Sequence, residues 1–346
     1  MNIFLALLLM GIGLFLLIKG SDIFVDAGTN IGKLFKLSEI IIGLTIVCAG
    51  TSLPELLLSI TASFNNTADF LLGNIIGTNL FNMCIILGII CLLNPLKLLR
   101  QTIRKDMNMS LLSSIILFVL LIDTFGTNLT DNVISRTDGI ILLLFFAIFM
   151  YYTLYEFGEY LRDTREKRYK EQKEKKAKGE KITTTKKQQI FTMKDIKKLI
   201  INGIVALISI VMIYAGAELV VNNAVVVAKH FNVSETFISI LIVSVGTSLP
   251  EISTSIAAIK KNRINIAIGN LIGSNMFNTL FVVGCSALIN PVKLTVPTLL
   301  VDSAVFIIVC LTLRLFTKKK PEITAMEGFT LISIYIFYIT FVIFRR

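Results

Sequence analysis

Two identical hexapeptides place a carboxylate, two hydroxyls and a proline inside long apolar stretches of the chain. GTSLPE stands at residues 50–55 and again at residues 246–251. Proline has no N–H and clashes with the preceding helical turn, so each copy predicts a helix break that frees backbone carbonyls. At membrane depth, such carbonyls are tolerated only where they are buried in protein or line a cavity. The hexapeptides therefore predict oxygen-lined sites at breaks in apolar helices.

The spacing of nearby polar residues predicts faces that carry only a few kinds of ligand. Residues four apart share a helix face. This rule groups a hydroxyl with the carboxylate in each hexapeptide, and a hydroxyl with an amide in GNIIGTNLFN (residues 73–82) and in GNLIGSNMFN (residues 269–278). The predicted ligands are Thr51, Ser52, Glu55, Thr78, Asn82, Thr247, Ser248, Glu251, Ser274 and Asn278.

This ligand set is typical of a hard cation. Ca²⁺ takes about six to eight oxygen ligands, and Na⁺ has a similar radius, whereas zinc prefers His or Cys. Glu55 and Glu251 are the only acidic residues in the middle of apolar stretches. Two buried carboxylates repel strongly at low dielectric. One Ca²⁺ or two Na⁺ would neutralise them, and a third Na⁺ would leave a net charge and make an exchange cycle electrogenic.

Composition and hydropathy predict an all-α polytopic membrane protein. Hydrophobic residues make up 54% of the 346 residues, charged residues make up 16%, and the mean hydropathy is +0.78. A helix that crosses lipid needs about 20 apolar residues, and open strands cannot satisfy their backbone there. We predict ten transmembrane helices near residues 3–18, 38–62, 68–93, 107–122, 138–154, 199–215, 234–258, 264–289, 297–313 and 327–344.

The chain aligns with itself at an offset of 196 residues, which is the separation of the two hexapeptides. The first repeat motif (residues 50–82) corresponds to the second (residues 246–278). We predict two five-helix repeats, residues 1–157 and 199–346, joined by a linker at 158–198. Because five is odd, the second repeat enters the membrane inverted. Inverted repeats are typical of secondary transporters, whose ion sites lie at the repeat interface.

The net charge of +11 is concentrated in the linker, residues 158–198, which holds fifteen of the 34 Lys and Arg residues. The positive-inside rule places this linker in the cytoplasm and both termini on the extracytoplasmic side. Contact of the linker with anionic lipid headgroups is expected. Because no aromatic interleaving or recognition motif accompanies the charge, we expect no nucleic-acid partner.

No sequence motif indicates catalysis or a resident cofactor. The chain has no Walker motif, no dinucleotide fingerprint and no Ser–His–Asp candidate set. We therefore expect that the protein is not an enzyme and has no cofactor. Ca²⁺ and Na⁺ are the expected transported ions.

The paired hexapeptide and decapeptide motifs resemble the repeats of the calcium/cation antiporter superfamily, particularly those of prokaryotic sodium/calcium exchangers. This resemblance implies ten helices in two inverted repeats, with the first and sixth sliding against a core. It implies the same ten ligands, together with backbone carbonyls near Cys48 and Ser244. Potassium-dependent members tend to carry Asp where this chain has Asn278, so the resemblance implies a potassium-independent exchanger.

The sequence leaves the coupling ion open. The leading hypothesis is a Na⁺/Ca²⁺ antiporter of a prokaryotic plasma (inner) membrane that works by alternating access. A H⁺/Ca²⁺ exchanger would use Glu55 and Glu251 as proton carriers instead. A passive cation channel is an alternative from a different class, and a purely structural membrane protein would not need the paired acids.

Overall fold

The computed structural model describes residues 3–64, 68–93, 95–98, 105–126, 133–177, 193–231, 244–293 and 298–344. This part of the chain consists of helices and four two-residue strands. Seven of its helical segments are long and apolar enough to cross a membrane, and a bent helix pair makes up to eight. The predicted span near 234–258 lies outside the described residues as far as residue 243. The protein is therefore a polytopic helical membrane protein.

The first half contains three long helices and two interrupted helical segments. The long helices are α1 (Ile3–Leu34), α8 (Asp106–Gly126) and α9 (Arg136–Ala177). The first interrupted segment consists of α2 (Glu39–Ile42), the π-helix η1 (Gly43–Val47), α3 (Cys48–Thr51) and α4 (Leu53–Phe64). The second consists of α5 (Ala68–Phe81), the π-helix η2 (Asn82–Ile86) and α6 (Leu87–Leu93).

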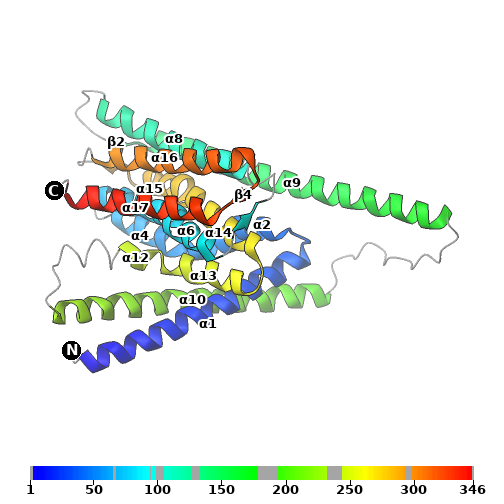
Figure 1. The fold of residues 1–346 in the computed structure, drawn as a ribbon, viewed down its shortest axis with the longest axis horizontal. Helices are drawn as coiled ribbons and strands as arrows, with labels where there is room; N and C mark the ends of the chain where they lie inside the picture. The colour runs from blue at the N-terminus through cyan, green and yellow to red at the C-terminus, as the bar shows by residue number, and fades with distance from the viewer. Residues whose placement is uncertain are drawn as a thin grey trace.

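The second half has a corresponding set. Its long helices are α10 (Met193–His230), α16 (Thr298–Lys319) and α17 (Ala325–Phe344). Its interrupted helices are α12 (Ser244–Thr247) with α13 (Leu249–Lys260), and α14 (Ile264–Met276) with the π-helix η4 (Phe277–Val282) and α15 (Val283–Ile289). The predicted linker is partly helical, because α9 continues to Ala177, far beyond the rest of the molecule (Figure 1).

Two short strand pairs join the two halves of the chain in matching ways. Strand β1 (Leu96–Lys97) pairs antiparallel with β4 (Glu322–Ile323), and β2 (Val133–Ile134) pairs antiparallel with β3 (Val292–Lys293). Each pair therefore takes one strand from each half of the chain. The two pairs are also equivalent, because β1 and β3 occupy positions 196 residues apart.

The long helices α1 and α10 run side by side along one face of the molecule (Figure 1). Glycines allow their backbones to approach. A Cβ added to Gly13 would lie 2.8 Å from the carbonyl oxygen of Gly216, and one added to Gly216 would lie 2.7 Å from that of Gly13. The pair packs on the remaining helices through a separate hydrophobic cluster that includes Ala27, Ala257 and Ala267.

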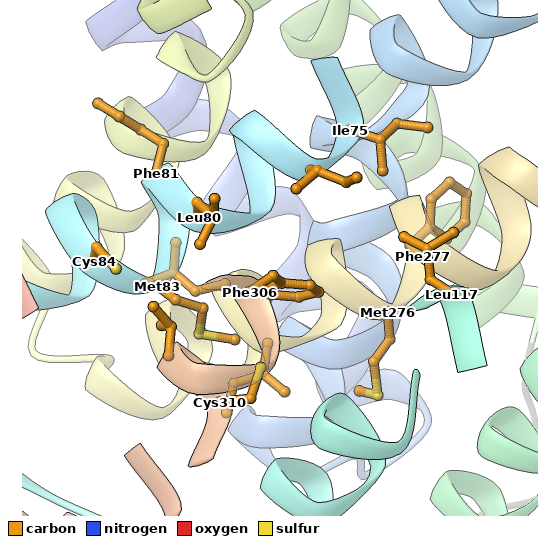
Figure 2. Close-up of a cluster of buried hydrophobic side chains, with 14 of the residues drawn as sticks. Ile75, Leu80, Phe81, Met83, Cys84, Leu117, Met276, Phe277, Phe306 and Cys310 are labelled. Carbon is orange, nitrogen blue, oxygen red and sulfur yellow. The ribbon is translucent and has the colours of Figure 1, made fainter. Parts of the chain in front are cut away.

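The main hydrophobic core lies among α5, η2, α6, α8, α9, α14, η4, α15, α16 and α17. Figure 2 shows part of it, where Phe306 and Cys310 of α16 approach Met83 of η2. Phe306 and Met276 are fully buried. This core packs around α5 and α14 and the π-helices η2 and η4 that continue them, and these four segments carry half of the predicted asparagine and hydroxyl ligands.

The interrupted helices of the two halves cross at glycines. A Cβ added to Gly269 on α14 would lie 2.5 Å from the carbonyl oxygen of Ile40 and 3.0 Å from the Cα of Gly43. These neighbours are backbone atoms, which cannot rotate away as a side chain can. The crossing therefore needs glycine, and it brings the segment that leads into the first hexapeptide against α14.

We predict that Gly269→Ala will lower the unfolding temperature of the purified protein in detergent, measured by circular dichroism. Overpacking of a tight helix contact costs about 1–3 kcal/mol. Gly203→Ala on α10 is the matched control, because its added Cβ would meet nothing within 4 Å. Equal unfolding temperatures of the two variants would contradict this view of the crossing.

Candidate cation site

Each hexapeptide forms a helix break, as the prolines predict. Ser52 stands between α3 and α4 with φ −90° and ψ 4°. Ser248 stands between α12 and α13 with nearly the same conformation, φ −90° and ψ 0°. The first break bends the helix axis by 42°. Pro54 and Pro250 then lie in the first turn of the following helix, where a missing N–H is tolerated best.

Nine of the ten predicted ligands are buried, with exposed fractions of 2% or less. The tenth, Thr247, is partly buried. The nine are Thr51, Ser52, Glu55, Thr78, Asn82, Ser248, Glu251, Ser274 and Asn278.

The fold brings ligands of both halves together. The Thr51 hydroxyl lies 3.4 Å from the Ser274 hydroxyl, which joins α3 to α14. Glu55 and Glu251 lie close enough for their charges to interact. Helix α4, which carries Glu55, contacts η4, and α13, which carries Glu251, contacts η2. Each glutamate helix therefore lies against the asparagine-bearing π-helix of the other half.

Most of these buried ligands have polar atoms with no hydrogen-bond partner among the described residues. Both carboxylate oxygens of Glu55 and of Glu251 lack one. So do the hydroxyls of Ser52, Thr78 and Ser248, the Oδ1 atom of Asn82, and the Oδ1 and Nδ2 atoms of Asn278. Buried polar atoms are nearly always hydrogen-bonded, and a buried charge without a partner is very costly. A cation among these oxygens would supply the missing interactions.

A comparison within the chain excludes helix capping as the role of the hexapeptide side chains. Ser/Thr followed three residues later by Asp/Glu is the capping-box pattern, and both hexapeptides have it. At Ser135 and Asp138 the box is formed, since the carboxylate accepts from the Ser135 N–H at 2.8 Å and the hydroxyl accepts from the Asp138 N–H at 3.3 Å.

A second box is formed at Thr324 and Glu327, with the Thr324 N–H 2.7 Å from the carboxylate. Ser248 makes no side-chain cap, and the Glu251 carboxylate has no partner among the described residues. The serine and glutamate side chains of the hexapeptides are therefore available to bind a ligand.

Two asparagines outside the predicted ligand set contact predicted ligands. The Thr51 hydroxyl donates to the Asn270 Oδ1 atom at 3.2 Å, and the Thr247 hydroxyl donates to the Asn74 Oδ1 atom at 3.4 Å. A hydroxyl that donates in this way keeps its lone pairs available for a cation. The sequence does contain a signal for Asn74, because Asn74, Thr78 and Asn82 are spaced four apart on a single helix face.

The orientation of the Asn82 amide is determined by the other half of the chain. Its Nδ2 atom donates to the Asn275 Oδ1 atom at 3.1 Å, which leaves the Asn82 Oδ1 atom as the available ligand. Asn275 also donates to the Asn79 carbonyl at 3.1 Å, and Asn79 donates to the Thr279 hydroxyl at 2.8 Å. These bonds tie α5 to α14 beside the site.

π-Helices occur at the site itself. η2 begins at Asn82, and η4 contains Asn278. η1 leads into the first hexapeptide. π-Turns inside α-helices are rare and are frequent at functional sites, because they change the direction of side chains within a helix.

A cavity of about 180 Å³ reaches Glu55 from one end of the molecule. Its lining includes Thr247 on α12 and Glu218 and Asn222 on α10. Glu218 therefore lines this route to Glu55. The cavity gives one side of the site a connection to the surroundings.

The described residues contain no group of three or more His, Cys, Asp and Glu side chains that could hold a metal ion. The cluster instead combines two carboxylates with hydroxyl and amide oxygens. This donor set fits Ca²⁺ or Na⁺ and does not fit zinc.

Comparisons with known proteins agree with this geometry. A family model described as sodium/calcium exchanger protein matches residues 5–155 and 202–344. The chain belongs to the sodium/calcium exchanger family.

Relatives of the exchanger include the sodium/calcium exchanger MaX1 of Methanosarcina acetivorans, which is 29% identical over 96% of this chain and 97% of its own length. The inner membrane protein YrbG of Escherichia coli is 29% identical over 92% of this chain and 90% of its own length. A solved structure of the sodium-calcium exchanger NCX_Mj has a TM-score of 0.75 at 27% identity, covering 99% of this chain and 100% of that chain.

These findings confirm the family resemblance that the motifs indicated. Members of the sodium/calcium exchanger family are transporters rather than enzymes, and the matches support cation and calcium antiport as the class of activity. The transported ions of this exchanger family are therefore substrates, and the buried oxygen cluster has the chemistry to bind them.

We predict that Ser248→Ala in the exchanger will leave the unfolding temperature in chelator unchanged and will reduce the rise that Ca²⁺ produces. Its hydroxyl has no hydrogen-bond partner among the described residues, and a ligand that binds only the folded state raises the unfolding temperature. Ser135→Ala should do the reverse, because it removes a cap worth about 1 kcal/mol but no ligand. If both variants behaved alike, the distinction between cap and ligand would be wrong.

Proposed function

We propose that the protein is a secondary active antiporter that exchanges Na⁺ for Ca²⁺ by alternating access. The observation that carries the proposal is the cluster of buried oxygen atoms without partners around Glu55 and Glu251. Ten side chains are its ligands: Thr51, Ser52, Glu55, Thr78, Asn82, Thr247, Ser248, Glu251, Ser274 and Asn278.

Charge determines which ions the site can exchange. Glu55 and Glu251 supply two negative charges in an environment that excludes water. One Ca²⁺ balances them, and so do two Na⁺, so the two ions compete for the same carboxylates. A third Na⁺ bound among the hydroxyl and amide oxygens leaves the loaded carrier with one positive charge. A stoichiometry of three Na⁺ to one Ca²⁺ is therefore electrogenic, and a membrane potential of 100 mV contributes about 2.3 kcal/mol per charge.

Ten transmembrane helices in two inverted five-helix repeats form the proposed architecture. The repeats are residues 1–157 and 199–346, with the basic linker 158–198 between them. The pairing of β1 with β4 and of β2 with β3 supports this arrangement, because the equivalent strands β1 and β3 each pair with a strand of the opposite half. The positive-inside rule then puts the linker in the cytoplasm and both termini outside a prokaryotic plasma membrane.

The packing of α1 and α10 supports alternating access by sliding. Their interface with the other helices contains small residues such as Ala27, Ala257 and Ala258 and is separate from the main core. Because this interface is separate from the main core, the helix pair can shift as a unit while the core stays packed. The rigid core meanwhile keeps the ligands of α5 and α14 in place.

Asn278 supports independence from K⁺, since it places a neutral amide where the resemblance indicates Asp in potassium-dependent exchangers. The name of the relative MaX1 supports Na⁺ as the coupling ion. A proton could compete for the same glutamates, so the coupling ion is the property that a flux measurement must decide.

We predict that proteoliposomes loaded with Na⁺ will take up ⁴⁵Ca²⁺ when diluted into choline medium. A pH gradient or a K⁺ gradient of equal size should give no more uptake than liposomes without protein. Because more positive charge leaves with Na⁺ than enters with Ca²⁺, the inside of the liposomes should become negative. Uptake driven by the pH gradient without Na⁺ would replace this proposal with H⁺/Ca²⁺ exchange.

We predict that Glu55→Gln and Glu251→Gln will each reduce exchange to background, because one carboxylate cannot neutralise Ca²⁺. Glu39→Gln is the matched control, since it makes the same change at the start of α2, outside the ligand cluster. The measurement is Na⁺-dependent ⁴⁵Ca²⁺ uptake at equal amounts of reconstituted protein. Retained exchange in either ligand variant would show that the charge accounting is wrong.

A further inference from the structure

A charged cluster connects α1 to the turn between α13 and α14. Asp26 on α1 accepts from the Lys261 Nζ atom at 2.6 Å and from an Arg263 guanidinium nitrogen at 3.2 Å. Lys261 also donates to the Asp22 carbonyl at 2.6 Å. Arg263 donates to the Thr29 hydroxyl at 2.6 Å. Two cations on one turn thus bind a single stretch of α1 about two helical turns long.

The turn presents both cations in a defined geometry. Asn262, between them, has φ 56°, in the left-handed region that Asn adopts more readily than most residues. The Arg263 N–H donates to the Ala258 carbonyl at 2.9 Å, and the Asn262 N–H donates to the Ile259 carbonyl at 2.8 Å. These bonds close the end of α13, so the cluster links α1 to the helix that carries Glu251.

The other half of the chain lacks this cluster. At the offset of 196 residues, Asp26 corresponds to Asn222, Lys261 to Asn65, and Arg263 to Thr67, none of which is charged. Asn65 and Thr67 lie outside the described residues. Asn222 lines the cavity that reaches Glu55. The equivalent position is therefore ion-paired at one end of the molecule and borders an open cavity at the other.

We propose that Asp26, Lys261 and Arg263 form an ion-pair lock that closes the cytoplasmic route to the cation site. This inference rests on the proposed function, which requires α1 to move against the core and places this end of α1 in the cytoplasm. The lock favours the state that is open on the side of Glu218 and Asn222. It separates each time the site opens to the cytoplasm.

The lock is weak enough to open in every cycle. The Asp26 side chain is 53% exposed, so water and salt screen its charge. Exposed ion pairs stabilise a structure only slightly. The lock therefore shifts the ratio of the two open states without fixing one of them.

We expect Asp26→Asn, which copies the residue at position 222, to shift the ratio toward the state open to the cytoplasm by about two- to fivefold, the size typical of exposed ion pairs. Hydrogen exchange of the protein in lipid nanodiscs should become faster in residues 257–264. It should become slower in residues 214–223, because the cavity on the other side closes in the shifted state. A purely local loosening would produce the first change without the second.

Asp22→Asn is the matched control. It removes the same charge one turn away on α1, where the Asp22 carboxylate forms no ion pair with any described residue. We expect its exchange to match the wild type at both places. Equal behaviour of the two variants, or faster exchange at residues 257–264 alone in Asp26→Asn, would overturn the lock.

Flux measurements separate failure of the lock from failure of the proposed function. In sided vesicles, Asp26→Asn should raise the apparent Ca²⁺ affinity on the cytoplasmic side and lower it on the other side, each about two- to fivefold. Raising choline chloride should shift the wild type in the same direction and leave Asp26→Asn unchanged. Absence of Na⁺-dependent uptake in the wild type would reject the exchange function, whereas the hydrogen-exchange result still decides the lock.

Discussion

Two buried carboxylates with no hydrogen-bond partner among the described residues are the constraint on which this structure depends. Glu55 and Glu251 are at most 1% exposed, although a cavity reaches Glu55 from one side. Burying such charges is unfavourable unless an ion or proton compensates them. Several of the surrounding hydroxyl and amide atoms also lack a partner among the described residues, so one bound cation would compensate several buried polar atoms at once. The same incompleteness allows the ion to be exchanged, since the protein itself never closes the site.

The rest of the fold prevents the protein's own donors and acceptors from forming hydrogen bonds to these side chains. Prolines start a new helix immediately after each serine, yet the serine and glutamate do not form the capping box that their spacing allows. At Ser135 and Thr324 the same pattern closes normally. The π-helices and the asparagine bonds across α5 and α14 then aim the remaining oxygens inward. The local sequence would therefore allow the serine and glutamate to form a capping box with their own helix, and tertiary packing prevents it.

In the proposed exchange cycle, the near-symmetry of the two halves would allow opposite sides to open in turn. The strand pairs and the asparagines of the repeated motifs recur in equivalent places. A symmetric carrier would have no preference between its two open states. The charged cluster around Asp26 occurs in one half only, so it is the place where the two routes become different.

The sequence alone determined the membrane class, the duplication and the helix breaks, and it predicts the ligand residues. These follow from local rules: apolar length, repetition, the missing proline N–H and four-residue spacing. The family resemblance added Na⁺ and Ca²⁺ as the expected exchanged ions, and the family match agrees with the resemblance.

Tertiary structure decided which polar atoms remain available. Asn74 and Asn270 belong to the site because they meet threonines of the opposite half, and a spacing rule within one helix does not reveal such a partner. The ion pairs of Asp26 likewise join residues more than 230 positions apart. Contacts between distant segments depend on how the helices pack against each other. The amino-acid pattern of a single helix therefore cannot specify them.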